Sequence, residues 1–302
     1  MTTATQTKVA ASLSDRALLV DLSIRRWQAR KKDRLLTQEL ADTKGSDVAW
    51  STVTKSLVAK DAIAELVRIE GAARAEHRNR TLPWSERKDE RIILHTGYFE
   101  YTAIMRSFED AWAPAVATFN QNYVQYREEA RRHSPNFRDE DYPDPGTMLG
   151  RFSFETTMRT LPPPEQFRDF RLALGDAEVA RLERIARDDV QAVIDLATQD
   201  IVERVNRVVG HMAERLRLYR RDADGKVENA FFDSVTENVW ELVQILQTLN
   251  ITGGTAIPGL AGDMAADLLL YTPNELRADD FARGEVAAAA EQILERMKEF
   301  AA

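Results

Sequence analysis

The chain has 302 residues, of which 44% are hydrophobic and 30% charged, so it can bury a sizeable core in one or two domains. Its formal net charge of −8 argues against a protein that coats duplex DNA over its whole surface, while local basic patches stay open. The absence of cysteine excludes disulfides and thiolate metal sites, and no apolar run approaches the ~20 residues that span a bilayer. We therefore expect a cytoplasmic protein that does not enter membranes.

The N-terminal part predicts one strand followed by helices. Residues 1–16 are small and polar, and we expect them to be poorly ordered. A β-like alternation over residues 17–27 predicts a strand that runs directly into a basic stretch. Residues 35–40 predict a short helix, and residues 51–77 predict a longer one with a good cap at its start.

The middle of the chain predicts a second long helix and the rest of a small sheet. Residues 98–132 form a helical pattern rich in aromatics, and Pro114 should kink it or divide it into two. Residues 149–160 alternate as a strand does, and residues 167–174 alternate again after a proline-rich break. With the strand over residues 17–27, this hairpin would complete a three-stranded sheet.

The chain is organised around a long helical pattern over residues 177–221, which would be roughly 65 Å long at 1.5 Å per residue. A second apolar helix over residues 227–249 can fold back on it, and Gly225 is the expected positive-φ residue of the turn. This predicts an extended antiparallel hairpin of the coiled-coil type, with Arg204 and Arg207 on its solvent face. Its apolar stripe comprises Ile201, Val205, Val208, Met212, Leu216 and Tyr219.

The C-terminal part predicts two helices, over residues 260–271 and 283–300, after a flexible glycine-containing linker. Between them, Thr272 and Glu275 have the spacing of a helix-capping box. The fold class is therefore α+β and predominantly α-helical, a small sheet packed with helices plus the hairpin. The expected division is a disordered N-terminus (1–16), an α+β core (17–175), the helical hairpin (176–250) and the C-terminal helices (251–302).

No catalytic, metal-binding or cofactor-binding residue is predicted. The four histidines are dispersed, and the sequence has no H-E-x-x-H motif, Walker A loop or G-x-S-x-G elbow. The segment "DADGK" suggests a calcium loop, but with Gly225 at the invariant glycine position the first ligand position falls on Arg220. The sequence therefore argues against an enzyme.

The strongest functional signal is a basic run around one tryptophan. Its cations could neutralise phosphates while Trp27 stacks on a base, which suits single-stranded nucleic acid. In the plainer interpretation Trp27 belongs to the core and the charges are solvated or paired with acids, as is common for charge runs. The run comprises Arg25, Arg26, Trp27, Arg30, Lys31, Lys32 and Arg34.

The segments "LLVDLSIRRWQARKKD" and "RFSFETTMR" resemble a family of uncharacterised phage, plasmid and prophage proteins, classed as a domain of unknown function. In that family an N-terminal strand runs into a W-x-G-R-K-K motif, and long helices and an R-F-S-F strand follow. Ala29 stands where the family has glycine, and the resemblance covers residues 18–174. It implies genes that accompany MoxR-type AAA+ ATPases and von Willebrand factor A proteins, and it carries over no catalytic residue.

We therefore expect a non-enzymatic accessory protein of a mobile element that docks onto a protein partner such as that AAA+ and von Willebrand factor A pair. A single-stranded nucleic-acid binding or annealing protein is the alternative, and a homo-oligomer stays open. The tip of the predicted hairpin carries both signs of charge, which suits a steered, salt-sensitive contact. Its candidate contact residues are Arg220, Arg221, Asp222, Asp224 and Lys226.

Overall fold

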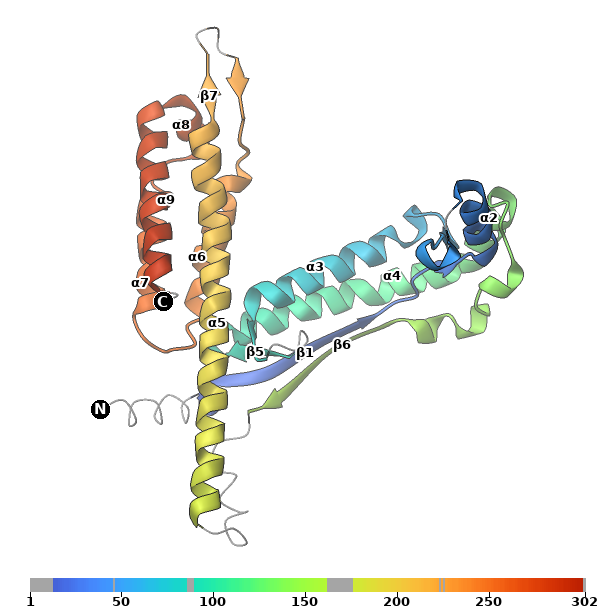
Figure 1. Ribbon diagram of the computed structural model, residues 1–302, viewed down its shortest axis with the longest axis horizontal. Coiled ribbons are helices and arrows are strands. Elements are labelled where there is room, and N and C mark those ends of the chain that lie inside the picture. The colour runs from blue at the N-terminus through green and yellow to red at the C-terminus, as the bar shows by residue number, and fades with distance from the viewer. Residues whose placement is uncertain are drawn as a thin grey trace. The chain divides into compact units, whose positions relative to one another are not determined.

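The computed structural model describes residues 13–45, 47–85, 90–161, 176–222, 224 and 226–300. Long helices accompany a small antiparallel sheet, so the predicted α-rich α+β class is confirmed (Figure 1). The chain divides into two compact units: unit 1 comprises residues 1–21, 78–101 and 158–302, and unit 2 comprises residues 22–77 and 102–157. This division differs from the consecutive segments expected from the sequence, because each unit combines segments that are distant along the chain.

The main sheet contains β4 (Leu82–Pro83), β5 (Arg91–Leu94), β1 (Ala17–Arg25) and β6 (Ser153–Thr160), in that order. The strands expected near residues 17–27 and 149–160 are both present and are neighbours. Strand β5 was not predicted, because its Ile92, Ile93 and Leu94 are all buried and therefore show no apolar–polar alternation. The strand expected at residues 167–174 lies outside the described residues.

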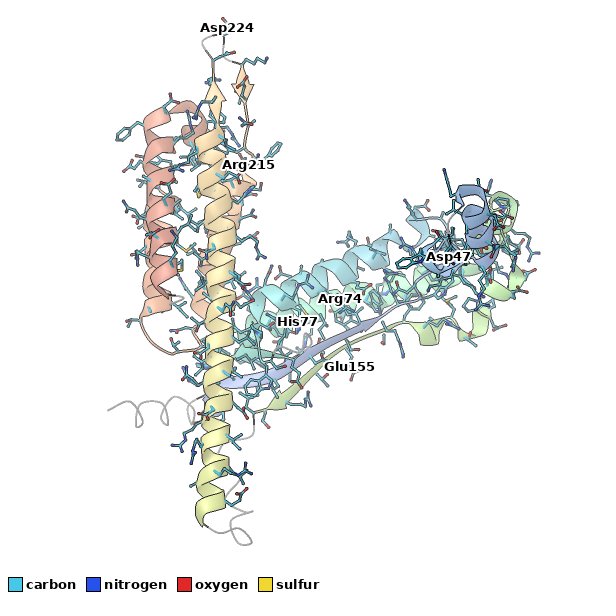
Figure 2. The ribbon with its side chains drawn as sticks, viewed as in Figure 1. Asp47, Arg74, His77, Glu155, Arg215 and Asp224 are labelled. Carbon is cyan, nitrogen blue, oxygen red and sulfur yellow. The ribbon has the colours of Figure 1, made fainter. Side chains whose placement is uncertain are left out.

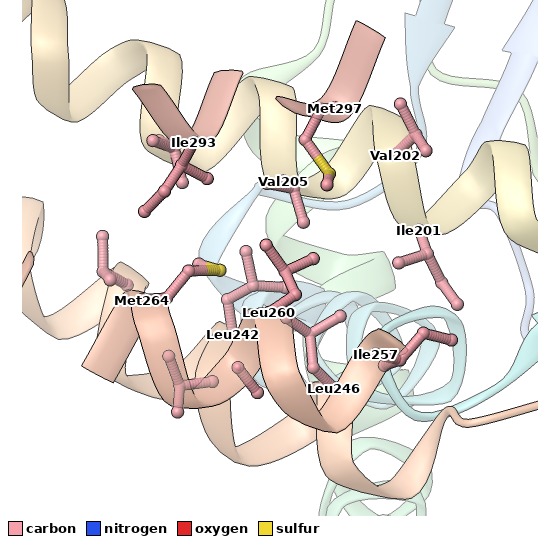
Figure 3. Packing of buried hydrophobic residues seen from close by; sticks show 14 of the residues in the cluster. Ile201, Val202, Val205, Leu242, Leu246, Ile257, Leu260, Met264, Ile293 and Met297 are labelled. Carbon is pink, nitrogen blue, oxygen red and sulfur yellow. The ribbon is translucent and has the colours of Figure 1, made fainter. Parts of the chain in front are cut away.

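In unit 1, α5 (Asp176–Leu218) packs against α9 (Asp280–Phe300) and α6 (Ser234–Thr248), and α7 (Ala256–Leu268) packs against both α6 and α9. The bundle core is drawn in Figure 3, where side chains from all four helices meet. Most of the predicted stripe on α5 is buried, with Val208 half-buried. The hairpin is nevertheless not free-standing, because further buried residues widen its apolar surface enough to contact several helices. These are Val202, Val209 and Ala213.

The predicted hairpin turn is longer than expected and partly extended. Helix α5 ends at Leu218 and α6 begins at Ser234, so the helical patterns read as far as residue 221 and from residue 227 were too long. Between them β7 (Arg220–Arg221) pairs with β8 (Val227–Glu228) in an antiparallel ribbon. Gly225, the expected positive-φ residue, lies outside the described residues.

The stretch expected to be a flexible linker is a close turn between α6 and α7. Ile251 and Ile257 are both fully buried in the unit 1 core. Gly253 has φ +67°, and a Cβ there would lie 2.6 Å from the Arg16 guanidinium, so the chain is packed tightly at this point. After α7, Thr272 and Glu275 form the predicted capping box at the start of α8 (Pro273–Ala278).

Unit 2 contains α2 (Arg34–Lys44), most of α3 (Ala64–Arg80) and of α4 (Tyr98–His133), and a ribbon of β2 (Arg30–Lys32) with β3 (Thr54–Ser56). The helix predicted over residues 51–77 was wrong at its start. Val53 and Thr54 are β-branched, and the segment pairs with β2 instead of beginning the helix. Helix α4 continues through Pro114 as one helix and is not divided.

The prediction that Arg204 lies on the solvent face of α5 was wrong. Its side chain is buried in unit 1 and donates to the backbone oxygens of Arg78 at 2.8 Å, Asn79 at 2.5 Å and Thr81 at 2.9 Å. It also pairs with Asp200 at 2.6 Å, one turn away on the same helix. Arg204 therefore satisfies carbonyls at the C-terminal end of α3 that have no partner within their own helix.

Trp84 packs against the hydrophobic core of unit 1. Within the part of the chain that the structure describes, no helix is both long and apolar enough to cross a bilayer.

Candidate binding surfaces

Trp27 is not available to stack on a base. Only 9% of the residue is exposed, and its ring lies 5.9 Å from that of Phe119 and 5.6 Å from that of Tyr123, centroid to centroid. Trp27 lies two residues after the end of β1 and packs into an aromatic core with α4, so the prediction that it contacts nucleic acid was wrong. The plainer interpretation of this residue is confirmed.

Arg26 also belongs to the framework of unit 2. Its Nε lies 2.5 Å from Glu70 Oε2, and both side chains are largely buried. Glu70 also accepts from Arg74 at 3.1 Å, and Arg74 donates to the backbone oxygen of Ile24 at 2.8 Å. This chain of contacts ties α3 to the end of β1, so the charge of Arg26 is neutralised within the unit.

Lys31 takes part in a second charge cluster, centred on Asp141. The two Asp141 oxygens lie 2.7 Å from Lys31 Nζ and 2.6 Å from Lys55 Nζ. Lys55 also lies 3.4 Å from Asp33, whose side chain caps the first turn of α2. Burial alone would raise the pKa of Asp141, but hydrogen bonds from Lys31 and Lys55 outweigh it and hold that pKa below its ordinary value. The cluster joins the β2–β3 ribbon to residues 136–141.

Replacing Lys55 with methionine should lower the free energy of unfolding by about 2 kcal/mol at neutral pH, because Asp141 and Asp33 lose a charged donor. The depressed pKa of Asp141 means that its contribution is present above its unfolded pKa of about 3.9 and is lost as pH falls through the folded value. In urea unfolding, the difference in free energy of unfolding between the natural chain and the variant should therefore be smaller at pH 3 than at pH 7. The exposed Lys44, replaced in the same way, is the control, and an equal loss there would contradict the assignment.

The remaining cations of the run are exposed, and two of them share a face. In the ribbon Arg30 lies opposite Ser56 and Lys32 lies opposite Thr54. Side chains alternate along a strand, so Arg30 and Lys32 lie on the face opposite to that of Lys31 and Asp141. Arg25 donates to the backbone oxygen of Gly150 at 3.5 Å, and Arg34 begins α2.

Arg30 also borders a groove of about 370 Å³ in unit 2. Lys60 and Arg68 line it as well, and Arg68 is held by Glu65 through bonds of 2.8 and 2.6 Å. Sequence reasoning missed Lys60 and Arg68, because they lie well beyond the basic run in the chain. Tertiary packing brings them beside Arg30. The apolar part of the lining consists of Ala29, Val58, Ile63, Ala64 and Val67.

Ala29, at the edge of this groove, has a left-handed backbone with φ +53°. Its backbone oxygen accepts from Leu57 N at 2.8 Å, which closes the turn onto the ribbon. The left-handed region favours glycine, which has no Cβ. In this chain the turn forms with alanine in spite of the conformational cost.

The described tip residues of the predicted hairpin are joined by hydrogen bonds at one end of unit 1. Asp222 Oδ1 accepts from the backbone N–H groups of Asp224 at 3.1 Å and Lys226 at 2.8 Å, and Asp222 N donates to Lys226 O at 3.0 Å. Asp224 lies at the outermost part of the turn (Figure 2). All of the tip residues expected to contact a partner are exposed: Arg220, Arg221, Asp222, Asp224 and Lys226.

Beside this turn, α5 and α9 border a hollow of about 440 Å³ whose lining includes four arginines. Two are neutralised locally: Arg283 pairs with Asp280 and lies over the Tyr219 ring at 4.6 Å, and Arg217 pairs with Glu291. Phe281, which follows Asp280 in the chain, is 76% exposed. The other two arginines of the lining are Arg220 and Arg221.

Across the described ranges, no three or more His, Asp or Glu side chains are placed to hold a metal ion. Comparison with protein-family models, with curated proteins and with solved structures gave no match. Function must therefore be inferred from the side chains of this chain itself.

Proposed function

We propose that the protein is a non-enzymatic binding protein that docks onto a protein partner through the hairpin end of unit 1. The hairpin end is defined as β7, β8, the described residues Asp222, Asp224 and Lys226 between them, and the adjoining hollow. The observation that carries the proposal is the position of Arg220 and Arg221, which are exposed and line a hollow of about 440 Å³. Both residues belong to β7, which pairs with β8.

The chemistry of this end suits an acidic segment of a partner. Arginine presents a planar fork of donors that can bind a carboxylate through two bonds at once. Exposed aromatic residues contribute strongly to protein interfaces, and Phe281 adjoins the hollow along the chain. The resemblance noted above suggests a co-encoded MoxR-type AAA+ ATPase or von Willebrand factor A protein of a phage or other mobile element as the partner, in the cytoplasm.

The test is direct binding of the purified chain to the co-encoded ATPase at several salt concentrations. The double variant Arg220→Glu/Arg221→Glu should weaken binding about tenfold or more, mainly through slower association, and the affinity of the natural chain should fall as salt rises. The matched control is Arg184→Glu/Arg207→Glu, which makes the same charge change at exposed positions of α5 outside the hollow.

Equal loss in both variants would mean that general charge, and not the hairpin end, controls the interaction. Unchanged binding by the Arg220/Arg221 variant would remove this surface from the proposal.

The nucleic-acid alternative is not supported in the form expected from the sequence. Trp27 is part of the core, and Arg26 and Lys31 are paired with acids inside unit 2.

A further inference from the structure

We propose that unit 2 carries a binding site for single-stranded nucleic acid, formed by one face of the β2–β3 ribbon and the adjoining groove. We call it the ribbon groove. This site is separate from the hairpin end of unit 1 and does not depend on the docking proposal. The site takes only two residues from the basic run and adds four from later in the chain. It comprises Arg30, Lys32, Thr54, Ser56, Lys60 and Arg68.

The ribbon face presents cations at a regular interval. Arg30 and Lys32 are two residues apart on one strand, which separates their Cα atoms by about 6.6 Å. The hydroxyl residues Ser56 and Thr54 lie opposite them on the same face. A row of cations and hydroxyl donors at this interval matches successive phosphates of an extended strand, where each cation can displace a bound counterion.

The other face of the ribbon explains why this row is held in place. Lys31 and Lys55 lie opposite each other in the register, and both contact Asp141. The acids nearest the ribbon are therefore neutralised by lysines on the inner face. Arg30 and Lys32 are left to present their charge outward.

The groove adds a place for a base beside the phosphate row. Its apolar wall includes Val58, Ile63 and Val67, and Val67 is 42% exposed. Among the described residues that line it, the charged side chains are all basic: Arg30, Lys60 and Arg68, of which Arg68 is paired with Glu65. A volume of about 370 Å³ lies in the range of about 300–1,000 Å³ typical of small-molecule pockets. Apolar walls beside cations suit an unpaired base attached to its phosphate, which a duplex does not offer.

An anionic membrane is the competing partner, because Leu35 and Trp50, near one end of the ribbon, are 58% and 89% exposed. Acidic residues accompany these side chains: Glu39 and Asp42 lie on the same helix as Leu35, and Asp47 caps the short 3-10 turn that holds Trp50. A broad anionic lipid surface that took up Leu35 and Trp50 would also face these carboxylates and be repelled by them, whereas a strand confined to the groove would not, because none of the three acids lines it. The observations therefore favour a nucleic-acid strand in the ribbon groove.

The test uses the full chain and a fluorescein-labelled twelve-nucleotide poly-dT strand, with fluorescence anisotropy recorded over a range of salt concentrations. The double variant Arg30→Ala/Lys60→Ala should weaken binding at low salt about tenfold or more. It should also reduce the slope of log affinity against log salt by about 1.4, since each phosphate contact to a single strand contributes about 0.7. The matched control, Lys44→Ala/Arg106→Ala, removes two exposed cations of unit 2 outside the ribbon groove and should bind within about twofold of the natural chain.

Thermal unfolding confirms that each variant is folded, and Arg30→Gln/Lys32→Gln replaces the first variant if that one is not. No binding of the strand at low salt, or equal loss in the control, would overturn the site. Competition by free thymidine monophosphate as strong as that by the strand would indicate a nucleotide pocket instead.

Binding to phosphatidylserine vesicles without binding to the strand would indicate a membrane surface and would also overturn the site. The Arg220→Glu/Arg221→Glu variant should keep its affinity for the strand. The ribbon groove and the hairpin end can therefore fail independently.

Discussion

Replacing Arg204 with methionine should lower the free energy of unfolding by about 3–5 kcal/mol, which is a large fraction of the stability of an ordinary domain. The guanidinium is buried and donates to the backbone oxygens of Arg78, Asn79 and Thr81. Methionine keeps much of the side-chain volume but donates no hydrogen bond. The variant therefore leaves buried carbonyls without their donor, and Asp200 without its cation.

A second largely buried cation, Arg91, shares this environment with Arg204 and Asp200. Burial lowers the pKa of Arg91 to about 10, while Asp200 acts in the opposite direction. The loss should appear in urea unfolding followed by circular dichroism. Arg207→Ala, at an exposed position of the same helix, should change the free energy of unfolding by less than about 0.5 kcal/mol. A loss below about 1 kcal/mol for Arg204→Met would show that water replaces the guanidinium without cost.

Replacing Trp27 with alanine should cost about 3–5 kcal/mol, because it opens a cavity among packed aromatic rings. Phe119 and Tyr123 are 2% and 0% exposed and contact Trp27, and the Phe119 ring also lies 5.6 Å from that of Phe152. Loss of the near-ultraviolet circular dichroism of these rings should accompany the loss of stability.

The matched control for Trp27 is Trp50→Ala. Trp50 is 89% exposed, so its replacement should change stability by no more than about 0.5 kcal/mol. Equal effects of the two substitutions would mean that the aromatic core around Trp27 does not hold unit 2 together.

Several features were determined by the sequence alone, because they depend on neighbours along the chain. The helical stripe from Ile201 to Tyr219 follows from the period of the α-helix, and those residues are indeed buried or half-buried. The capping box joins Thr272 and Glu275 across a single turn, so its spacing was sufficient. The alternation of β1 likewise predicted a strand with one buried face.

Other features were decided only by the tertiary structure, because local period defines an apolar face without saying which element covers it. For α5, the cover proved to be α9 as well as α6. The roles of charged residues depended on distant partners in the same way: Arg204 meets the end of α3, and Lys31 meets Asp141. A buried, paired cation and a solvated surface cation look alike in a sequence. Their difference arises from burial and from the hydrogen-bond acceptors that packing brings within reach.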